Sequence, residues 1–412
     1  MSEQSQKLVP KLRFPEFLSG EAWDFLNANK IFEPISNKNH NSDLPILAIT
    51  QEHGAIPREM IDYNVIATEQ SIQSYKVVEV GEFIISLRSF QGGIEYSNYR
   101  GICSPAYIIL RKKVNVFDLF FKYYFKTDLF IRDLNKNIEG IRDGKMVSFS
   151  QFSERFLPLP KYEEQQKIAE CLLSLDDLII AQNQKVECLK QHKKGLMQQL
   201  FPPESENVPE RRFPEFDSTG KWEEFLMNDI TFKVSKRNKG NEKHPVYSIN
   251  NVKGFVPQSE QFEGVDSSKR GYDISMYNHI DENTFAYNPA RINVGSIGYS
   301  GPLKDVIISS LYVCFKTTDS VNDDFLTCYL ETDLFKKAVD DSVEGGIRSY
   351  LFYENFAKIR IKLPTIPEQK KIAEMFTSIN EFISHAIEIG ESLKKHKKGL
   401  MQCLFPKLDE AS

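Results

Sequence analysis

Cysteine is scarce and dispersed in this sequence. The 412 residues include six cysteines, and no two of them form a C-x-x-C pair. A zinc knuckle or a small secreted disulfide scaffold needs closely spaced cysteines, so the sequence argues against both and predicts reduced thiols. The seven histidines form no H-E-x-x-H motif and no close cluster with cysteine. The sequence therefore indicates no metal site.

Long apolar runs are also missing. No stretch approaches the roughly 18 consecutive apolar residues of a membrane-spanning helix, and residues 1–14 are too polar for a secretory signal peptide. The sequence therefore predicts a cytoplasmic protein without membrane contact. At 412 residues and 41% hydrophobic content, the chain is long enough for two or three domains with their own cores.

Positive charge is not in excess. The net charge is −5, with 52 Lys and Arg against 57 Asp and Glu. This balance disfavours nucleic-acid binding by overall electrostatic attraction. A protein that reads DNA through local basic loops, or whose partners supply part of the positive surface, is still allowed.

Motifs for catalysis are fragmentary. Residues 288–290 (Asn-Pro-Ala) lack the second proline and the aromatic residue of the Asn-Pro-Pro-aromatic tetrad of adenine methyltransferases. Residues 140–145 end in Gly-Lys without the spacing or the Ser/Thr of a P-loop. Glu368 and Lys370 form the E-x-K fragment of many nucleases, but the first half of the chain has Gln166 in place of the lysine. An acidic residue in the first turn of a helix more simply favours the helix dipole.

One segment of the chain occurs twice. HKKGLMQQLFP fills residues 192–202 and HKKGLMQCLFP fills residues 396–406, so only Gln199 and Cys403 differ. Coincidence explains this match poorly, and we infer that the chain is a tandem duplication. A proline ends each copy and is expected to end its helix.

Each copy closes a long segment with the apolar spacing of a coiled coil, in steps of four and three residues. The first seam comprises Ile168, Leu172, Leu175, Ile179, Gln182, Val186, Leu189, Lys193, Leu196 and Leu200. The second comprises Ile372, Phe376, Ile379, Ile383, Ala386, Gly390, Leu393, Lys397, Leu400 and Leu404. A helix of about 35 residues is roughly 50 Å long. We expect the two helices to pair antiparallel, with one globular head at each end and Gly390 allowing close approach or bending. Two separate helices, each packed on its own head, are the alternative.

The heads in front of the helices match more weakly. The matching segments are 44–50 with 244–250, 127–130 with 332–335, and 140–142 with 346–348. Strands are expected at residues 82–87, 106–110, 284–287 and 311–315, and amphipathic helices at residues 118–134 and 323–339. Residues 89–101 and 289–301 are expected to be exposed loops between strands.

The order of head, long helix, head and long helix, with K-I-A-E near each helix start and H-K-K-G-L-M-Q-x-L-F-P at each end, resembles the specificity subunit of type I restriction-modification systems. The resemblance covers residues 14–406, and residues 288–298 and 307–315 are also similar to target recognition domains of that family. It implies a reader of double-stranded DNA, in which each head contacts one half-site and the helices fix the gap. It also implies two methyltransferase (modification) subunits that bring S-adenosylmethionine, and restriction subunits that use ATP and Mg. The specificity subunit itself has no catalytic centre and binds no cofactor.

The sequence thus predicts a mixed α/β (α+β) fold with a pseudo-two-fold internal repeat: two similar target recognition domains and an antiparallel coiled coil. The expected division is residues 1–158 for the first recognition domain, 159–202 for the first long helix, 203–212 for a linker, 213–362 for the second recognition domain, and 363–412 for the second long helix with the C-terminal tail.

DNA contacts are expected from arginine, lysine and amide side chains in the loops, because these groups can bind base edges bidentately. The candidates in the first head are Arg88, Ser89, Gln91, Arg100, Arg142 and Lys145, and those in the second are Lys269, Arg270, Arg291, Asn293 and Arg348. A solvated loop side chain is the alternative for each. Arg142 and Arg348 occupy matched positions in divergent heads, so we expect them to bind phosphate or to support the head.

Lysines gather near the end of each long helix. They are Lys190, Lys193 and Lys194, and Lys394, Lys395, Lys397 and Lys398. One interpretation is a solvated face that complements the helix dipole, and the other is a docking surface for partner subunits or the DNA backbone.

Two nearly identical helices with two divergent heads indicate one mechanical role and two different targets. Our main hypothesis is a non-catalytic, sequence-specific DNA recognition subunit of a type I restriction-modification complex. The alternative is a two-headed scaffold that binds proteins and has no DNA specificity. A self-sufficient nuclease or methyltransferase is a third class, and the fragmentary motifs argue against it.

Overall fold

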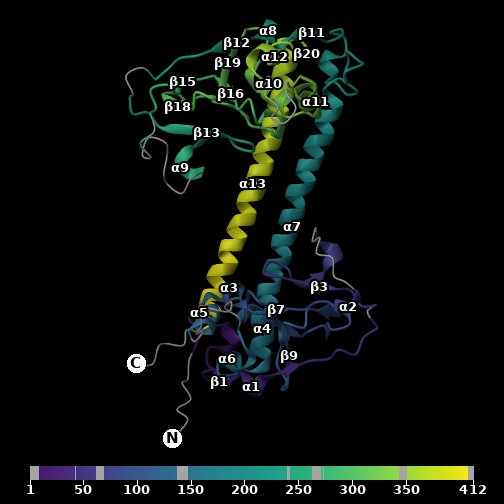
Figure 1. Ribbon diagram of the computed structural model, residues 1–412, viewed down its shortest axis with the longest axis vertical. Coiled ribbons are helices and arrows are strands. Elements are labelled where there is room, and N and C mark those ends of the chain that lie inside the picture. Colours follow the sequence, from purple (N-terminus) through teal and green to yellow (C-terminus); the bar gives the residue numbers. More distant parts are fainter. Residues whose placement is uncertain are drawn as a thin grey trace. The chain divides into compact units, whose positions relative to one another are not determined.

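The computed structural model describes residues 9–41, 43–61, 69–136, 147–238, 242–261, 271, 273–342 and 350–406. The chain divides into two compact units, which we call unit 1 (Met1–Asn183 with Glu388–Ser412) and unit 2 (Gln184–Ile387). Two long helices, α7 (Tyr162–Leu200) and α13 (Ile366–Leu404), each begin in one unit and end in the other (Figure 1). Among the described residues, no helix combines the length and apolarity needed to cross a membrane.

Unit 1 contains a four-stranded antiparallel sheet. Its order is β2-β9-β6-β7, with strands Phe32–Ile35, Ile108–Lys112, Phe83–Ile85 and Glu95–Tyr96. The other antiparallel pairs are β3 (Leu47–Thr50) with β4 (Gly54–Pro57), β5 (Lys76–Val78) with β8 (Gly101–Cys103), and β1 (Asp24–Asn27) with β10 (Phe156–Leu159). A parallel bridge between Ile46 and Ile102 connects the first two pairs in the order β4-β3-β8-β5.

Unit 2 repeats this arrangement. Its first sheet has the order β12-β19-β16-β17, with strands Thr231–Val234, Val313–Thr317, Phe285–Tyr287 and Ile297–Tyr299. Its second sheet has the order β14-β13-β18-β15, with strands Gly254–Pro257, Val246–Asn250, Val306–Ile308 and Asn278–Ile280. β13 and β18 are parallel, and β11 (Glu223–Leu226) pairs with β20 (Arg360–Leu363). The shared order confirms the predicted internal repeat and the mixed α/β fold.

Short helices connect the strands in both units. In unit 1 they are η1 (Pro15–Phe17), α1 (Ala28–Ile31), η2 (Arg58–Met60), α2 (Glu69–Ile72), α3 (Ser89–Gly92), α4 (Asp118–Tyr124), α5 (Asp128–Asn135) and α6 (Phe149–Ser153). In unit 2 they are η3 (Pro214–Phe216), α8 (Met227–Ile230), α9 (Gln258–Gln261), η4 (Ile292–Val294), α10 (Asp323–Leu330), α11 (Asp333–Ser342) and α12 (Tyr353–Phe356).

The four predicted strands are confirmed as β6, β9, β16 and β19, but the two amphipathic helices were predicted wrongly as single elements. Each is broken in the middle, into α4 and α5 in unit 1 and into α10 and α11 in unit 2. The Oγ1 atoms of Thr127 and Thr332 each accept a hydrogen bond of 3.2 Å from the backbone N of Phe130 and Phe335. Because such a bond caps a new helix, the repeated T-D-L-F segment marks a helix start.

The predicted loops at residues 89–101 and 289–301 were also partly wrong. Each contains a strand of the four-stranded sheet, β7 or β17, preceded by a single helical turn, α3 or η4. Their glycines and polar residues concealed these short strands, because a strand of two or three residues leaves almost no alternation in the sequence.

Aromatic side chains fill both cores. In unit 1, Phe32 packs edge-on against Phe83 and Phe121, with ring centroids 5.5 and 5.2 Å apart. In unit 2, Phe285 stacks on Phe315 with centroids 5.0 Å apart. Buried aromatic rings contribute large apolar areas and favour tilted or offset contacts, which gives each unit a core of its own.

The predicted seams of α7 and α13 are confirmed, since every seam residue is buried or half-buried. In unit 1, Ile168 and Leu172 of α7 share one hydrophobic cluster with Leu404 of α13. In unit 2, Leu200 of α7 shares a cluster with Phe376 of α13. Within each unit, the first turns of one long helix therefore pack with the last turns of the other, as an antiparallel pair requires.

Gly390 is not needed for close approach of the two helices. A Cβ atom added there would lie 3.7 Å from Cγ of Gln182 and 3.8 Å from Oδ1 of Asn183. These are ordinary van der Waals distances, so alanine would fit. The approach of the backbones therefore does not depend on glycine at this position, and the expected role of Gly390 in bending stays a prediction.

Candidate nucleic-acid interface

Each unit carries an exposed turn that follows the middle strand β6 or β16 and begins with an arginine. Arg88 precedes α3 and Arg291 precedes η4, and both are exposed. Both turns end at a glycine with positive φ, +80° at Gly93 and +88° at Gly295. A Cβ atom on Gly93 would lie only 2.0 Å from the carbonyl oxygen of Phe125, so glycine is required there. Arg88 and Arg291 thus hold the same place directly before the turn, although Arg291 lies one residue nearer to its glycine and the surrounding sequences do not match.

In unit 1, side chains from other elements hold the carbonyl groups of this turn. Asn135 of α5 donates from Nδ2 to the carbonyl of Phe90 at 2.6 Å. Lys126, between α4 and α5, donates from Nζ to the carbonyl of Gly92 at 2.9 Å. Because these hydrogen bonds hold its carbonyl groups, the backbone of the turn is pre-organised. Arg88 can therefore bind a ligand without further ordering of the backbone.

Lys126 also forms an ion pair with Glu95 of β7, with Nζ 2.6 Å from Oε2. The Glu95 side chain is 1% exposed and that of Lys126 27%. Burial raises the pKa of Glu95 and lowers the pKa of Lys126, while the attraction between them opposes both shifts. In unit 2 the equivalent residue before the capping threonine is Glu331, which pairs with Lys193 of α7 instead. The buried lysine–glutamate pair of unit 1 therefore has no counterpart among the described residues of unit 2.

A β-hairpin packs against each turn. In unit 1, a Cβ atom on Gly92 would lie 2.5 Å from the side chain of Gln51, at the tip between β3 and β4. In unit 2, a Cβ atom on Gly295 would lie 3.4 Å from the carbonyl oxygen of Asn251, at the tip between β13 and β14. We call each combination the turn–tip surface. It comprises residues 51–53 and 88–93 in unit 1, and residues 251–253 and 291–295 in unit 2.

The hairpin of unit 2 is fixed by a close approach of two glycines. A Cβ atom on Gly298 of β17 would lie 2.9 Å from Cα of Gly254, where the hairpin crosses the strand. Beside this crossing is a groove of about 460 Å³, lined in part by Val252, Tyr299 and Thr327. The tip, the turn and β17 therefore form one continuous surface.

Four of the predicted DNA-contact residues lie exposed on these surfaces. They are Arg88 and Gln91 in unit 1, and Arg291 and Asn293 in unit 2. Ser89 differs, because it is buried and its Oγ accepts a hydrogen bond of 2.8 Å from the backbone N of Ser86. Its hydroxyl therefore supports the turn from inside.

Arg100 lies in the connection from β7 to β8 and belongs to neither the turn nor the tip. It is exposed, and its Nε lies 3.1 Å from Oε2 of Glu79. Exposed pairs of this kind are weak, so Arg100 can exchange its partner readily. The other predicted contacts lie outside the described residues: Arg142, Lys145, Lys269, Arg270 and Arg348.

Sequence reasoning missed the hairpin tips. The segments that lead into them, residues 44–50 and 244–250, match in the repeat, whereas the tips read Gln-Glu-His at 51–53 and Asn-Val-Lys at 251–253. Matching strands that lead into differing tip residues are typical of a scaffold that holds a specificity-determining contact. That comparison could have identified the tips from the sequence.

The start of each long helix is clamped to its own unit by a buried ion pair. Nε and Nη2 of Arg13 bind the two carboxylate oxygens of Glu164, both at 2.7 Å. Arg212 binds Glu368 in the same way, again with both distances at 2.7 Å. Bidentate arginine–carboxylate pairs fix orientation as well as distance, so the first turn of each helix is held in a defined direction.

The glutamine that follows each of these glutamates completes the clamp. Oε1 of Gln165 accepts from the backbone N of Phe117 at 2.9 Å, and Oε1 of Gln369 accepts from the backbone N of Asn322 at 2.8 Å. These amides lie directly before α4 and α10. The repeated Glu-Gln dipeptide is therefore a structural joint between helix and head.

The fragments of catalytic motifs have structural roles or lie outside the described residues. Both carboxylate oxygens of Glu368 are occupied by Arg212. Oδ1 of Asn288 accepts from the backbone N of Ala290 at 3.0 Å, within a local turn. Residues 140–145 are outside the described part of the chain. No group of three His, Cys, Asp or Glu side chains in that part is arranged to hold a metal ion.

The end of each long helix inserts a phenylalanine into an aromatic core. Phe201 packs on Phe325 of unit 2 with centroids 5.4 Å apart, and Phe405 packs on Phe120 of unit 1 at 5.3 Å. The two receiving residues occupy equivalent positions in α10 and α4. The repeated motif has to fit the same aromatic site twice, which explains why its sequence is nearly identical in both copies.

The single difference between the two copies lies where only the backbone is used. The carbonyl of Gln199 accepts from the backbone N of Arg211 at 2.9 Å, and that of Cys403 accepts from the backbone N of Leu12 at 3.0 Å. Any side chain supplies the same carbonyl. The exchange of glutamine for cysteine therefore leaves the contact intact.

The lysines of the repeated motif are partly engaged in ion pairs. Nζ of Lys194 lies 3.6 Å from Oδ2 of Asp333, and Nζ of Lys398 lies 3.6 Å from Oδ2 of Asp128. Lys397 forms an ion pair with Asp176. The lysine and aspartate of the first two pairs are equivalent in the repeat. These lysines therefore tie each helix end to the T-D-L-F helix start, in addition to facing solvent.

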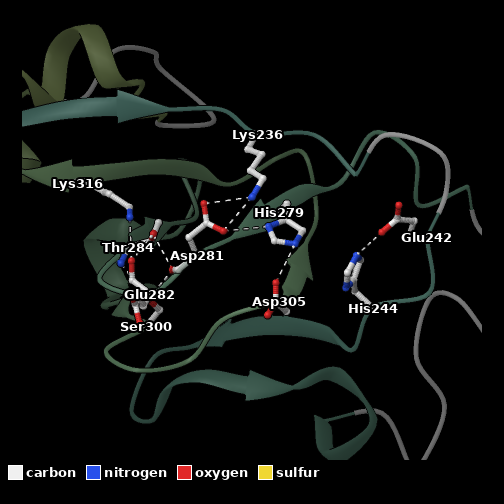
Figure 2. A network of polar contacts seen from close by, with 10 residues as sticks. All are labelled: Lys236, Glu242, His244, His279, Asp281, Glu282, Thr284, Ser300, Asp305 and Lys316. Atoms are coloured by element: carbon white, nitrogen blue, oxygen red, sulfur yellow. Dashed lines mark hydrogen bonds and ion pairs between the residues drawn. The ribbon is translucent and has the colours of Figure 1, made fainter.

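A polar network in unit 2 surrounds His279 of β15 (Figure 2). Its Nδ1 lies 3.4 Å from Oδ1 of Asp281 and its Nε2 lies 3.7 Å from Oδ1 of Asp305. Nζ of Lys236 donates to Oδ1 of Asp281 at 3.0 Å, and Thr284 donates to the carbonyl of Asp281 at 2.8 Å. These contacts connect β15 with the chain after β12 and with the turn before β18. The network therefore joins the two sheets of unit 2.

The model of the type I restriction modification DNA specificity domain matches the chain at residues 22–191 and again at residues 220–394. Together these matches cover most of the sequence. Their two copies agree with the internal repeat seen in the helices and in the strand orders.

Among characterised relatives, the chain is similar to two specificity subunits of Methanocaldococcus jannaschii. It is 25% identical to the type I restriction enzyme MjaVIII specificity subunit over 350 residues, which cover 80% of this chain and 79% of the relative. It is 24% identical to the MjaIX specificity subunit over 379 residues, which cover 85% and 84%.

Two solved structures share the fold. A chain of a type I restriction-modification system, solved for its complex assembly and conformational transition, aligns with a TM-score of 0.57 at 13% identity over 92% of this chain and 96% of that one. The S subunit of the type I system from M. genitalium aligns with a TM-score of 0.52 at 13% identity, over 97% and 100%. The duplicated sequence, the repeated strand order and these matches together show that the chain belongs to the family of type I restriction-modification DNA specificity subunits.

Proposed function

We propose that each unit of this chain reads one half-site of a bipartite target in double-stranded DNA, and that the chain directs methylation and restriction by partner subunits. The observation that carries the proposal is the turn–tip surface. Both units present an exposed arginine on an equivalent turn, beside a hairpin whose tip has different side chains in the two units. Recognition of two different half-sites requires the same backbone arrangement in both units with different exposed side chains.

The shared and the divergent residues have different roles in this proposal. An arginine precedes the turn in both units, so we assign Arg88 and Arg291 to groups that every DNA sequence has, namely backbone phosphates. Gln91 and Asn293 lie on the same turns and can reach base edges, since amides bind adenine bidentately. Other contacts come from Arg100, Lys145, Lys269 and Arg270, whereas Arg142 and Arg348 bind phosphate or support the head.

The chain as a whole is acidic, with a net charge of −5. Binding therefore depends on these local cations and on positive surface supplied by the partners. Replacing Arg88 or Arg291 by alanine should weaken binding similarly on all sequences and should reduce the slope of log affinity against log salt concentration by about one. A changed half-site in either variant would contradict the phosphate role.

We propose that α7 and α13 set the gap between the half-sites. Each helix is 39 residues long, or about 60 Å at 1.5 Å per residue. Half-sites on one face of DNA lie about 34 Å apart for each helical turn. The division into recognition domains at residues 1–158 and 213–362, joined by the linker at 203–212, is part of the same proposal.

The partners proposed are two methyltransferase subunits, which bring S-adenosylmethionine, and restriction subunits, which bring ATP and Mg. Leu178 of α7 and Phe382 of α13 occupy equivalent positions off the seam and are 54% and 65% exposed. Two equivalent apolar side chains suit two copies of one partner. We propose that the methyltransferase subunits dock there, in the cytoplasm where the host DNA lies.

Sequencing of methylated bases in a host with and without this gene tests the function. We expect a bipartite motif that is methylated only when the gene is present. Insertion of one heptad at matched points of α7 and α13 should lengthen the unread gap by about three base pairs, since seven residues add roughly 10 Å. An unchanged gap would refute the role of the helices.

The second candidate function is the two-headed scaffold that binds proteins. It predicts that the chain with its methyltransferase partner binds duplexes of the methylated motif and random duplexes equally. Preference for the motif excludes it. Methylation by the purified chain alone would instead indicate a catalytic centre in this chain.

A further inference from the structure

We infer that Val252, at the tip of the β13–β14 hairpin, reads the 5-methyl group of a thymine in the half-site of unit 2. The inference rests on the proposed function and identifies a specificity-determining residue within it. The argument uses the exposure of this side chain, the way in which its backbone is held, its neighbours, and the equivalent position in unit 1.

Val252 is 91% exposed, and no large hydrophobic side chain among the described residues is more exposed. Its isopropyl group therefore adds almost nothing to the stability of the fold. A single exposed apolar residue is common on protein surfaces, so exposure alone does not assign a role.

The backbone of the tip is held in one conformation. Oδ1 of Asn250 accepts hydrogen bonds from the backbone N of Val252 at 2.8 Å and of Lys253 at 3.1 Å. The close approach of Gly298 to Gly254 fixes the hairpin on β17. Val252 is thus projected outward from a rigid support, which lowers the entropy lost when it makes a contact.

The neighbours of Val252 suit DNA. Three polar neighbours are exposed: Lys253 at the tip, and Arg291 and Asn293 on the adjacent turn. The turn–tip surface of unit 2 carries no acidic residue. A two-stranded β-ribbon fits the major groove, where an apolar side chain can contact the thymine methyl group. The lysine and arginine can meanwhile reach phosphates on either side of the groove.

The equivalent tip of unit 1 is supported from the equivalent residue and carries a different side chain. Oγ1 of Thr50, at the position of Asn250, accepts from the backbone N of His53 at 3.0 Å. The residue equivalent to Val252 is Glu52, whose side chain is 86% exposed. An apolar group and a carboxylate on equivalent supports cannot favour the same base edge. The position therefore differs between the units in the way that a base contact should.

The test uses the chain assembled with its methyltransferase subunits and duplexes that contain the methylated motif. Each thymine in the two half-sites is replaced in turn by deoxyuridine, which lacks only the 5-methyl group. For the wild type, one replacement should weaken binding about fourfold, the effect of burying a single methyl group. In the Val252→Ser variant, the thymine and deoxyuridine duplexes should bind equally at that position.

Two control variants should keep the fourfold effect. Glu52→Ser changes the equivalent tip in unit 1. Phe232→Ser removes another exposed hydrophobic side chain of unit 2, in β12, whose register with β19 places it away from the turn. Val252→Ser should fold normally because the side chain makes almost no contact within the protein.

Three results would overturn the inference. In the first, no deoxyuridine replacement in the motif weakens binding by the wild type. In the second, the Val252→Ser variant keeps every effect of deoxyuridine. In the third, the Val252→Ser variant binds all duplexes more weakly by one common factor. The last result would indicate an apolar wedge between bases rather than a methyl contact. Absence of any methylated motif in the host would refute the proposed function itself, which keeps the two failures distinct.

Discussion

Replacement of Lys126 by methionine tests the pre-organised turn of unit 1. Methionine keeps most of the apolar stem of the lysine but removes its ammonium group. Glu95, 1% exposed, then loses its cation, and the carbonyl of Gly92 loses its donor. A longer contact of 3.5 Å from Nζ to the carbonyl oxygen of Gln51 is lost as well, so the effect reports on the contacts of this one ammonium group.

The expected loss of stability follows from burial. Removing one partner of a buried ion pair costs about 3–5 kcal/mol. Because 27% of the Lys126 side chain is exposed, water can partly replace it, and we expect about 3 kcal/mol. Replacing both Glu95 and Lys126 by methionine removes the buried charge altogether. The double variant should lie within about 1 kcal/mol of the wild type, a difference that reflects the lost bond to Gly92.

The pH dependence has a definite sign. Burial raises the pKa of Glu95 above its ordinary value of 4.5, and loss of Lys126 raises it further. A raised carboxyl pKa means that this group's contribution to stability is complete below pH 4.5 and is lost as the pH rises through the folded-state pKa. The Lys126→Met variant should therefore be closest to the wild type near pH 4.5 and should fall increasingly behind it towards pH 7.

Urea unfolding and hydrogen–deuterium exchange measure these effects. Amides of residues 88–103 should exchange faster in Lys126→Met than in the wild type, and the double variant should restore part of the protection. Glu331→Ala is the matched control, because Glu331 holds the equivalent position in unit 2 and its own side chain is 46% exposed, while its partner Lys193 is 15% exposed. It should cost less than Lys126→Met, since the cation that loses its partner is not as deeply buried as Glu95. A double variant as unstable as the single one, or a loss that does not grow with pH, would refute the reasoning.

Other substitutions test further parts of the structure. Phe405→Ala should destabilise unit 1 by about 3–5 kcal/mol, seen as faster exchange in α4 with little change in the core of unit 2; equal loss in both units would contradict separate cores. Gly298→Ala should cost about 1–3 kcal/mol, because its Cβ would lie 2.9 Å from Cα of Gly254, and it should weaken methylation only through the half-site of unit 2. Thiol reagents should label exposed Cys188 first and leave Cys314 unmodified, since burial raises the pKa of the Cys314 thiol to about 12; early modification of Cys314 would show that its strand is not buried.

The sequence revealed the long helices because their signal is local and repeated. Every residue of the two predicted seams is buried or half-buried, and the apolar spacing needs only the helical period to be recognised. The same helical spacing wrongly predicted one continuous helix across Phe125–Thr127, where a threonine cap begins a second helix. The cap depends on a single side-chain hydrogen bond to the backbone, and the spacing of apolar residues carries no information about that bond.

The candidate site was only partly accessible from the sequence. Loop arginines and amides were predicted from their chemistry, and Arg88 and Arg291 indeed lie exposed on their turns. Ser89 was predicted with them, although its hydroxyl faces inward to Ser86. Neighbours in the chain can point in opposite directions, and only the path of the backbone decides which of them meets solvent.

The amino-acid sequence by itself determined the duplication, the two long amphipathic helices and the family, because each is recorded in the order and spacing of residues along the chain. The tertiary structure decided which residues share a surface. It brought the hairpin tips, more than thirty residues away in the chain, against the arginine turns, and it showed that the repeated Glu-Gln and Leu-Phe segments bind the heads. Contacts between distant residues depend on how strands pair and pack, and no local period along the chain encodes that pairing.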